Sequence, residues 1–323
     1  MDRRGTTIAL AVILVPPGPT SEVHAQQTGP LVRIGWLNPA TIPPRESFRE
    51  ALRELGYIEG KNVTFETRLA EGNLDQLPEL AVQLIRLKVD IIVAVGPNAI
   101  KAAHQATHTI PIIMAFWGTE GLIESRIVGS FAKPGGNVTG VYMLASELDA
   151  KRLELLLQAV PKAKTIAVLD PGPGFTLTQV QQVARAARVQ LRIVEVPGDK
   201  GYEGAFEAMI KARIDALLVP SVPRFSQDRQ RIVALTAKYR MPAMYEWGAI
   251  AEEGGLMAYG PIQAELDRLA AGYVDKVLRG TRPAELAVAQ PTKFELVINM
   301  KTAKALGLTI PQAVLLRAER VIE

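Results

Sequence analysis

Two stretches of the sequence end in the same tryptophan–glycine pair, and tryptophan is well suited to contact an apolar ligand. IPIIMAFWG ends at Trp117 and Gly118, and MPAMYEWG ends at Trp247 and Gly248. Each is a short, proline-led apolar run, which favours a buried strand. An aromatic face stabilises a well-placed aromatic partner by about 0.5–1.5 kcal/mol beyond area burial. The pair therefore suggests two walls of one binding site, although a tryptophan at a strand end is also commonly a core residue.

Polar residues occupy matching positions after other predicted strands. Asn38 and Asp170 each follow a strand that opens a repeated unit, and Ser221 follows the third strand of the second unit. In an open parallel sheet, ligands bind where strands end and helices begin. We therefore predict the following ligand-binding residues: Asn38, Gly96, Pro97, Asn98, Phe116, Trp117, Tyr142, Asp170, Ser221, Tyr245, Glu246 and Trp247.

Several of these residues also have a purely structural interpretation. Asparagine and aspartate before proline or glycine are common turn residues, Ser221 could cap the following helix, and Tyr142 could pack at a hinge. In favour of binding, backbone N–H groups at the helix start after Gly96 attract a carboxylate by about 0.3–1 kcal/mol. Glu246 can accept hydrogen bonds from an ammonium group. A small organic anion or an amino acid with an apolar body would suit such a site.

The sequence offers little for catalysis or metal binding. It contains no cysteine, which excludes disulfides and thiolate chemistry. His104 and His108 have the i,i+4 spacing of metal ligands, but no third ligand is evident. No G-x-S-x-G, H-E-x-x-H or phosphate-binding loop occurs. We therefore expect no catalytic residue, no metal site, no cofactor and no enzymatic activity.

Strand and helix patterns alternate along the chain, and the order occurs twice. The motifs IGWLNPA, VDIIVAVGP and TIPIIMAFWG correspond to IAVLDPG, IDALLVPSVP and RMPAMYEWG at a nearly constant offset. This alternation predicts an α/β fold of two Rossmann-like lobes with parallel sheets, joined by a multi-strand hinge. We expect lobe 1 to comprise residues 30–142 and about 262–288, and lobe 2 residues 143–261 and about 289–323.

The start of the chain has the pattern of a secretory signal. Arg3 and Arg4 precede a short apolar segment, Ile8 to Val15, and Val23-His24-Ala25 fits a small-residue cleavage site. The segment is too short for a permanent membrane helix, and without cysteine no lipid anchor on an N-terminal cysteine is expected. We expect a cleaved signal peptide, residues 1–25, and an unanchored periplasmic protein, with Sec and twin-arginine export both open.

The charge pattern excludes one class of partner. The net charge is +4, and the composition is 48% hydrophobic and 22% charged, as in soluble globular proteins. The basic residues are scattered along the sequence, with no run that is interleaved with aromatic residues. We therefore expect no nucleic-acid partner.

Three stretches taken together resemble a known family. FREALRELGYIEGKNVTFETRLAEGNLDQLPELAVQLI, PGGNVTGVYMLASELDAKRLELL and QPTKFELVINMKTAKALGLTIP are similar to the substrate-binding components of bacterial ABC importers related to tryptophan and aromatic amino acid binders. The resemblance covers essentially the whole mature chain. It implies a type I periplasmic-binding-protein fold with three crossovers, capture of a small-molecule ligand by hinge closure, and a permease and an ATPase at the inner membrane as partners. We expect the protein itself to be a monomer.

Two loops depart from the pattern expected of that family. LNPATIPP contains more proline than the Ser/Gly-rich loop expected there, and GPN replaces a hydroxyl-rich loop. Both lie at the implied pocket, so the ligand could differ from an amino acid. Two other functions remain open: a periplasmic sensor that presents its closed form to a membrane receptor and, with less support, an α/β enzyme.

Overall fold

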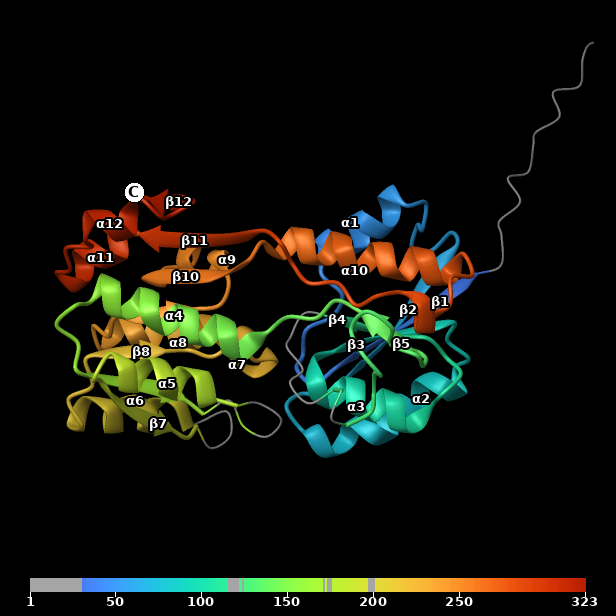
Figure 1. Cartoon of the computed structure of the whole chain (residues 1–323), viewed down its shortest axis with the longest axis horizontal. Coiled ribbons are helices and arrows are strands. Elements are labelled where there is room, and N and C mark those ends of the chain that lie inside the picture. The colour runs from blue at the N-terminus through green and yellow to red at the C-terminus, as the bar shows by residue number, and fades with distance from the viewer. Residues whose placement is uncertain (1–30, 116–121, 124, 171, 173–175, 197–200) are drawn as a thin grey trace, which may run out of the picture.

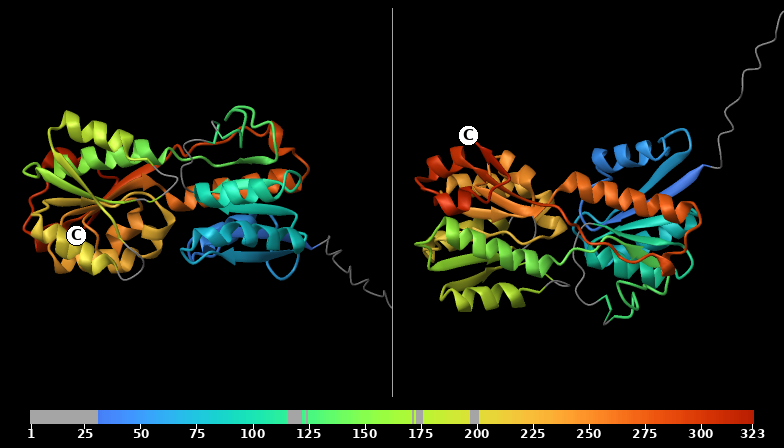
Figure 2. Two further views of the ribbon diagram at one scale, coloured as in Figure 1. Left: turned by 90° about the horizontal axis from the view of Figure 1, so that it is seen from below. Right: turned by 45° about the horizontal axis from the view of Figure 1, so that its top comes forward.

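The computed structural model describes residues 31–115, 122–123, 125–170, 172, 176–196 and 201–323. The chain forms two α/β lobes that lie end to end along the long axis of the molecule (Figure 1). We call the part built on the five-stranded sheet lobe 1 and the part built on the seven-stranded sheet lobe 2. Two further views show the same separation of the lobes (Figure 2). The two mostly parallel α/β sheets confirm the predicted fold class.

Lobe 1 has a parallel sheet with the strand order β2-β1-β3-β4-β5. Helices α2 and α3 cover one face, and α1 with α10 covers the other. Side chains of β1 alternate accordingly: Ile34 and Trp36 pack with α1, whereas Leu37 packs with α2. The elements are β1 (Val32–Asn38), α1 (Glu46–Glu54), β2 (Val63–Leu69), η1 (Leu74–Gln76), α2 (Leu77–Arg86), β3 (Ile91–Val95), α3 (Gly96–Ala106), β4 (Ile112–Ala115), β5 (Val138–Gly140), α10 (Gln263–Leu278) and η2 (Pro283–Glu285).

Lobe 2 has the strand order β12-β11-β10-β9-β8-β6-β7, and only the β10–β11 pair is antiparallel. Helices α4, α5, α11 and α12 cover one face, and α6, α8 and α9 cover the other. The elements are α4 (Ala145–Ala159), β6 (Thr165–Leu169), α5 (Thr178–Ala186), β7 (Gln190–Val194), α6 (Gly201–Lys211), β8 (Ala216–Leu218), α7 (Pro223–Gln227), α8 (Arg229–Lys238), β9 (Ala243–Tyr245), α9 (Gly248–Glu252), β10 (Met257–Pro261), β11 (Phe294–Asn299), α11 (Met300–Leu306), α12 (Gln312–Leu315) and β12 (Arg320–Ile322).

Three segments of chain cross between the lobes. They lead from β5 to α4, from β10 to α10, and from η2 to β11. The first and third lie side by side, because the Tyr142 N–H donates to the Ala289 carbonyl over 2.8 Å and the Ala289 N–H donates to the Gly140 carbonyl over 2.9 Å. Connections of this kind confine relative motion of the lobes to a hinge. Within the described ranges, no helix combines the length and hydropathy that a membrane span requires.

Candidate functional site

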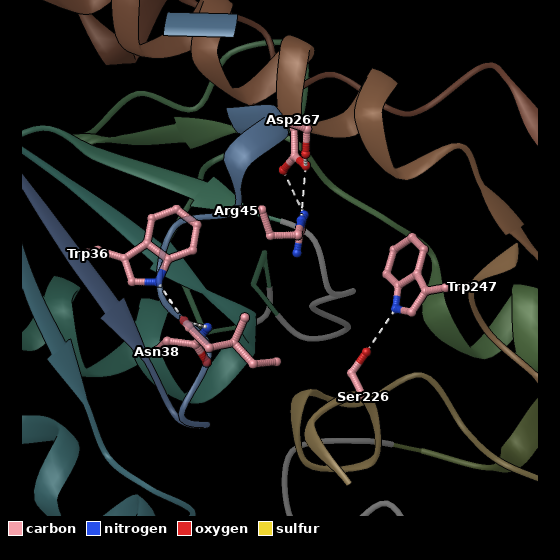
Figure 3. Close-up of polar contacts among 8 residues, drawn as sticks. Trp36, Asn38, Arg45, Ser226, Trp247 and Asp267 are labelled. Carbon is pink, nitrogen blue, oxygen red and sulfur yellow. Dashed lines mark hydrogen bonds and ion pairs between the residues drawn. The ribbon is translucent and has the colours of Figure 1, made fainter. Parts of the chain in front are cut away.

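The carboxyl ends of both sheets are directed toward the junction between the lobes, and a group of polar and aromatic side chains gathers there. Trp36, Asn38 and Arg45 come from lobe 1, and Ser226 and Trp247 come from lobe 2 on the opposite side (Figure 3). The space between these two groups is the candidate ligand site, since ligands of open parallel sheets bind at this edge.

The loop between β1 and α1 forms the lobe 1 side of this space, and hydrogen bonds fix its shape. The Trp36 indole N–H and the Asn38 side-chain amide both donate to the Ile42 carbonyl, over 3.0 Å and 2.8 Å (Figure 3). The Asn38 side-chain oxygen accepts from the Ala40 N–H over 2.9 Å. Asn38 and Trp36 are fully buried. In this structure, therefore, Asn38 organises the loop with both ends of its amide.

Trp247, the second of the two repeated tryptophans, forms a side-chain hydrogen bond within lobe 2, and a nearby hydrogen bond connects the two lobes. The Trp247 indole N–H donates to the Ser226 hydroxyl over 3.1 Å (Figure 3). The next residue, Gln227, accepts through its side-chain oxygen from the Thr41 N–H of lobe 1 over 2.8 Å. The fixed β1–α1 loop thus contacts the end of α7 directly. This contact is a candidate for holding the lobes together around a ligand.

Arg45 is the functional candidate that the sequence analysis missed. Its guanidinium lies between the two indoles in the close-up (Figure 3). It binds Asp267 of α10 with two hydrogen bonds, Nε to Oδ2 at 2.9 Å and Nη2 to Oδ1 at 2.7 Å, and the Ser47 hydroxyl donates to the same carboxylate. Asp267 is fully buried, whereas the Arg45 side chain is 18% exposed. Asp267 therefore fixes the position of the Arg45 guanidinium through Nε and Nη2, and an arginine held in this way can contact a ligand carboxylate through its other N–H groups.

A buried polar cluster lies at the carboxyl edge of the lobe 2 sheet. Arg152 donates to the Asp149 carboxylate and to the Tyr259 carbonyl, each over 2.6 Å. The Ser221 N–H donates to Asp149 over 3.3 Å, and the Ser221 hydroxyl donates to the Glu246 carboxylate. Burial raises the pKa of Asp149 above its ordinary value, although Arg152 and the Ser221 N–H act in the opposite direction. Asp149 is paired with Arg152, and Glu246 adds a second carboxylate to this buried cluster.

The remaining lobe 1 candidates lie at the start of α3 and in the first crossover. Gly96 has φ of 77° and begins the helix, and Pro97 and Asn98 are half-buried in its first turn. Tyr142 is 4% exposed and packs against Phe131 with ring centroids 4.3 Å apart, so it lies in the hinge. The predicted contacts Phe116 and Trp117 lie outside the described residues.

The side chains of the remaining lobe 2 candidates lie in different surroundings. The Asp170 carboxylate accepts from the Gly172 N–H over 2.9 Å, as in an Asx turn. The Tyr245 hydroxyl bonds the Thr236 hydroxyl of α8 over 2.9 Å, and the residue is 1% exposed. Burial raises the pKa of this phenol. Tyr245 thus packs on the α8 side of the sheet, whereas its neighbour Glu246 joins the polar cluster with Ser221.

The described residues contain no group of three or more metal-ligating side chains that could hold an ion. The rings of His104 and His108 have centroids 5.0 Å apart. Burial, and secondarily the charge of His108, lowers the pKa of His104. The pair is therefore a contact at the end of α3 without a third ligand in the described part of the chain.

Comparisons with known proteins identify the family to which the chain belongs. The profile of the family described as "ABC transporter substrate binding protein" matches residues 38–322. The "Tyrosine-binding protein" of Clostridioides difficile (strain R20291) is 25% identical over 275 residues, which span 84% of this chain and 78% of that protein.

Solved structures show the same relationship. The ABC domain in complex with L-Trp from Streptococcus pneumonia has a TM-score of 0.78 and 26% identity to this chain, with 90% of this chain and 100% of that chain covered. A ligand-free, open substrate binding protein from Clostridium difficile has a TM-score of 0.60 at 22% identity, with 90% and 99% covered, and shows the shared fold alone. The predicted type I periplasmic-binding-protein fold is thereby confirmed.

Proposed function

The chain belongs to the family of ABC transporter substrate-binding proteins, and we propose that its own solute is an aromatic or branched amino acid or a related carboxylate. The solute is held between the lobes and is not chemically changed. Two relatives support an aromatic amino acid: one is described as a tyrosine-binding protein and the other as a complex with L-Trp.

The observation that carries this proposal is that Arg45 of lobe 1 and Trp247 of lobe 2 approach the lobe junction from opposite sides (Figure 3). Lobe 1 contributes the Arg45 guanidinium and the first turn of α3, which suit a carboxylate. Lobe 2 contributes Glu246 beside Ser221, which suits an ammonium group. Trp247 borders the same space and suits an apolar or aromatic side chain (Figure 3). An α-amino acid carries these three features at once.

We retain the other predicted ligand contacts as part of this proposal, with different roles. Asn38 and Asp170 act by shaping their loops, and Phe116 with Trp117 supplies the aromatic wall that corresponds to Trp247. Tyr142 acts through the hinge. Tyr245 supports Glu246 from the core side of the sheet.

Closure of the hinge couples binding to a change of shape. We propose that residues 30–142 with about 262–288 and residues 143–261 with about 289–323 move as two bodies, and that the ligand contacts both only in the closed form. To move a population from 1:99 to 99:1, a ligand must favour the closed form by about 5.5 kcal/mol. A permease with its ATPase would recognise the closed form. We place the protein in the periplasm as a monomer, after loss of residues 1–25.

Isothermal titration calorimetry with a small panel tests the ligand class. L-tyrosine, L-tryptophan and L-leucine are compared with 3-phenylpropionate, which lacks the ammonium group, and with tyramine, which lacks the carboxylate. We expect at least one amino acid to bind with micromolar or lower Kd, about 8 kcal/mol or more, and to be recovered unchanged. The two truncated compounds should bind at least about tenfold more weakly. Absence of binding for the whole panel, or equal binding of tyramine, contradicts the proposal.

A further inference from the structure

The end of lobe 2 that is remote from lobe 1 carries a group of exposed basic residues. Strands β6, β7, β8, β9 and β10 begin at this end, because they run toward the lobe junction. Strand β11 runs the opposite way and leads into α11 at the same end (Figure 1). The turns that lead into β6, β7, β8 and β9, together with α6 and α11, supply the members. We call this set the basic end surface: Lys162, Lys164, Arg188, Lys211, Arg213, Arg240 and Lys304, all exposed.

Backbone and side-chain contacts show that these turns are neighbours. The Gln190 N–H donates to the Lys164 carbonyl over 2.8 Å, which joins the first two turns. The Asp215 carboxylate accepts from the Lys164 N–H over 2.8 Å, which joins the first turn to the third. The Leu217 N–H donates to the Pro242 carbonyl over 2.8 Å, which joins the third to the fourth. The surface is therefore continuous, although its residues are scattered in the sequence.

Charges of opposite sign do not balance this surface. In the stretches 160–164, 187–189, 211–215 and 239–242, Asp215 is the acidic residue, and its carboxylate already accepts from backbone N–H groups. In α6, the exposed Glu207 lies four residues before Lys211, so two acidic residues stand against the seven basic ones of this surface. Within the part of the chain that the structure describes, no member of the basic end surface forms an ion pair. Arg240 donates through Nη2 to the Ala305 carbonyl of α11 over 2.9 Å. All seven side chains are nevertheless exposed, so their positive charge is presented to solvent.

Backbone geometry does not require arginine at these turns. Arg188, Arg213 and Arg240 each follow a helix and have φ of 56°, 53° and 53°. This left-handed conformation is easiest for glycine and is costly for residues with a side chain. A cation at a helix C-terminus gains from the helix dipole, but a lysine or arginine within the last turn would gain the same without strain. Lys88, which follows α2 in lobe 1, has the same conformation, so this backbone geometry by itself does not distinguish the basic end surface.

We propose that the basic end surface binds an anionic membrane surface through the headgroups of lipids such as phosphatidylglycerol. Clusters of about four to eight lysines and arginines suffice for such attraction, which acts within a Debye length of the bilayer. In the turns that carry these residues the aromatic side chain is Tyr239, which is half-buried and stacks on Phe206 with ring centroids 5.9 Å apart, so it offers no open face to a nucleic-acid base. The basic end surface lies opposite the ligand site, so a docked protein keeps that site open to solvent.

Vesicle co-sedimentation tests this proposal. The protein is mixed with vesicles of phosphatidylglycerol and phosphatidylcholine in equal parts, and with vesicles of phosphatidylcholine alone, at 20 mM and 500 mM NaCl. We expect at least tenfold stronger partitioning to the anionic vesicles at low salt, and loss of that difference at high salt. The triple variant Arg188→Glu, Arg213→Glu, Arg240→Glu should lower partitioning to anionic vesicles at least tenfold.

A matched variant of lobe 1 distinguishes the effect of charges on the basic end surface from the effect of the net charge of the protein. Lys61, Lys88 and Lys101 are exposed, and Lys88 has φ of 53° after α2. Replacing these three lysines by glutamate lowers the net charge of the protein by the same amount as the triple arginine variant. This variant should retain most of its binding to anionic vesicles. Equal loss in both variants, or no preference of the unchanged protein for anionic vesicles, refutes the proposal. Tighter binding to a soluble polyanion such as heparin than to the vesicles refutes the membrane as the partner. Ligand affinity and Tm of each variant show that it is folded, and they are independent of the vesicle result.

Discussion

The contact between Thr41 and Gln227 gives the sharpest prediction about closure. It is a hydrogen bond between the lobes, formed by the Thr41 N–H and the Gln227 side-chain oxygen at 2.8 Å. The Thr41 loop is held in place by Trp36 and Asn38, which both donate to Ile42. The lobe 1 partner is therefore fixed before the lobes meet. Replacement Gln227→Ala should lower the stability of the closed form relative to the open form.

The expected size follows from one neutral hydrogen bond. Such a bond contributes about 0.5–1.5 kcal/mol net, and 1.4 kcal/mol is a factor of ten. If the unliganded protein is mainly open, the free energy that the closed form loses weakens the apparent binding free energy by the same amount. We therefore expect Gln227→Ala to raise the Kd of the best ligand about two- to tenfold. Gln227→Glu keeps a side-chain acceptor for the Thr41 N–H and should stay close to the unchanged protein.

Isothermal titration calorimetry of the two variants gives the result, and denaturant unfolding shows whether either is destabilised. Gln227 is half-buried at the end of α7, so both variants should fold. A Kd of Gln227→Ala within experimental error of the unchanged protein would falsify the role of this contact in closure. So would equal weakening by Gln227→Glu, because the carboxylate retains the acceptor.

Four further outcomes follow from contacts in the two lobes. Trp247→Ala should weaken ligand binding at least about tenfold in the same titration; unchanged affinity removes the indole from the site. Arg152→Met leaves the buried Asp149 carboxylate without its cation and should lower the free energy of unfolding by about 3–5 kcal/mol in urea; a loss below 1 kcal/mol would speak against the pair. Because burial raises the pKa of Asp149, the folded form binds its proton more tightly than the unfolded form, so this group makes the free energy of unfolding fall as pH rises from about 4. In urea unfolding at several pH values, Asp149→Asn should lack this part of the pH dependence. The same dependence of the free energy of unfolding on pH in both proteins would contradict the prediction. A Cβ at Gly260 would overlap the Glu246 carbonyl, whereas one at Gly272 of α10 meets open space; Gly260→Ala should therefore lower Tm by several degrees, and Gly272→Ala should leave it equal or higher.

The repeated strand and helix pattern was enough to predict the architecture of both lobes. The paired motifs of the sequence lie on β1 and β6, on β3 and β8, and on β4 and β9, because buried parallel strands are nearly continuous apolar runs. Helix α4 was not predicted. It packs among α5, β8, β9 and β10, and its buried residues include Asp149 and Arg152, so it lacks the clean apolar stripe by which a helix is usually found.

The candidate site was only partly predictable for a related reason. Arg45 and Asp267 lie far apart in the sequence and meet only because α10 returns to lobe 1. Asn38 was predicted from its place after β1, but its use as a loop-forming residue depends on the position of Ile42. Tyr245 and Glu246 are adjacent in sequence, but their partners are the Thr236 hydroxyl of α8 and the Ser221 hydroxyl, and only the folded structure shows this difference.

The basic end surface could not be predicted from the sequence either. Along the sequence, Arg188, Arg213 and Arg240 are separated by whole helices and strands. Parallel strand order places the turns that carry them at one end of lobe 2. A count of charges in sequence windows cannot detect such a surface, because strand order decides which turns become neighbours.

The most direct test of ligand capture between two moving lobes is a distance measurement across the site. Because the chain has no cysteine, cysteines introduced at the exposed positions Glu71 in lobe 1 and Gln230 in lobe 2 can be spin-labelled selectively. Double electron–electron resonance should give a long or broad distance distribution without ligand and a single shorter distance at saturation with the tightest-binding amino acid. An unchanged distribution at a ligand concentration that saturates the calorimetric titration would contradict capture by closure.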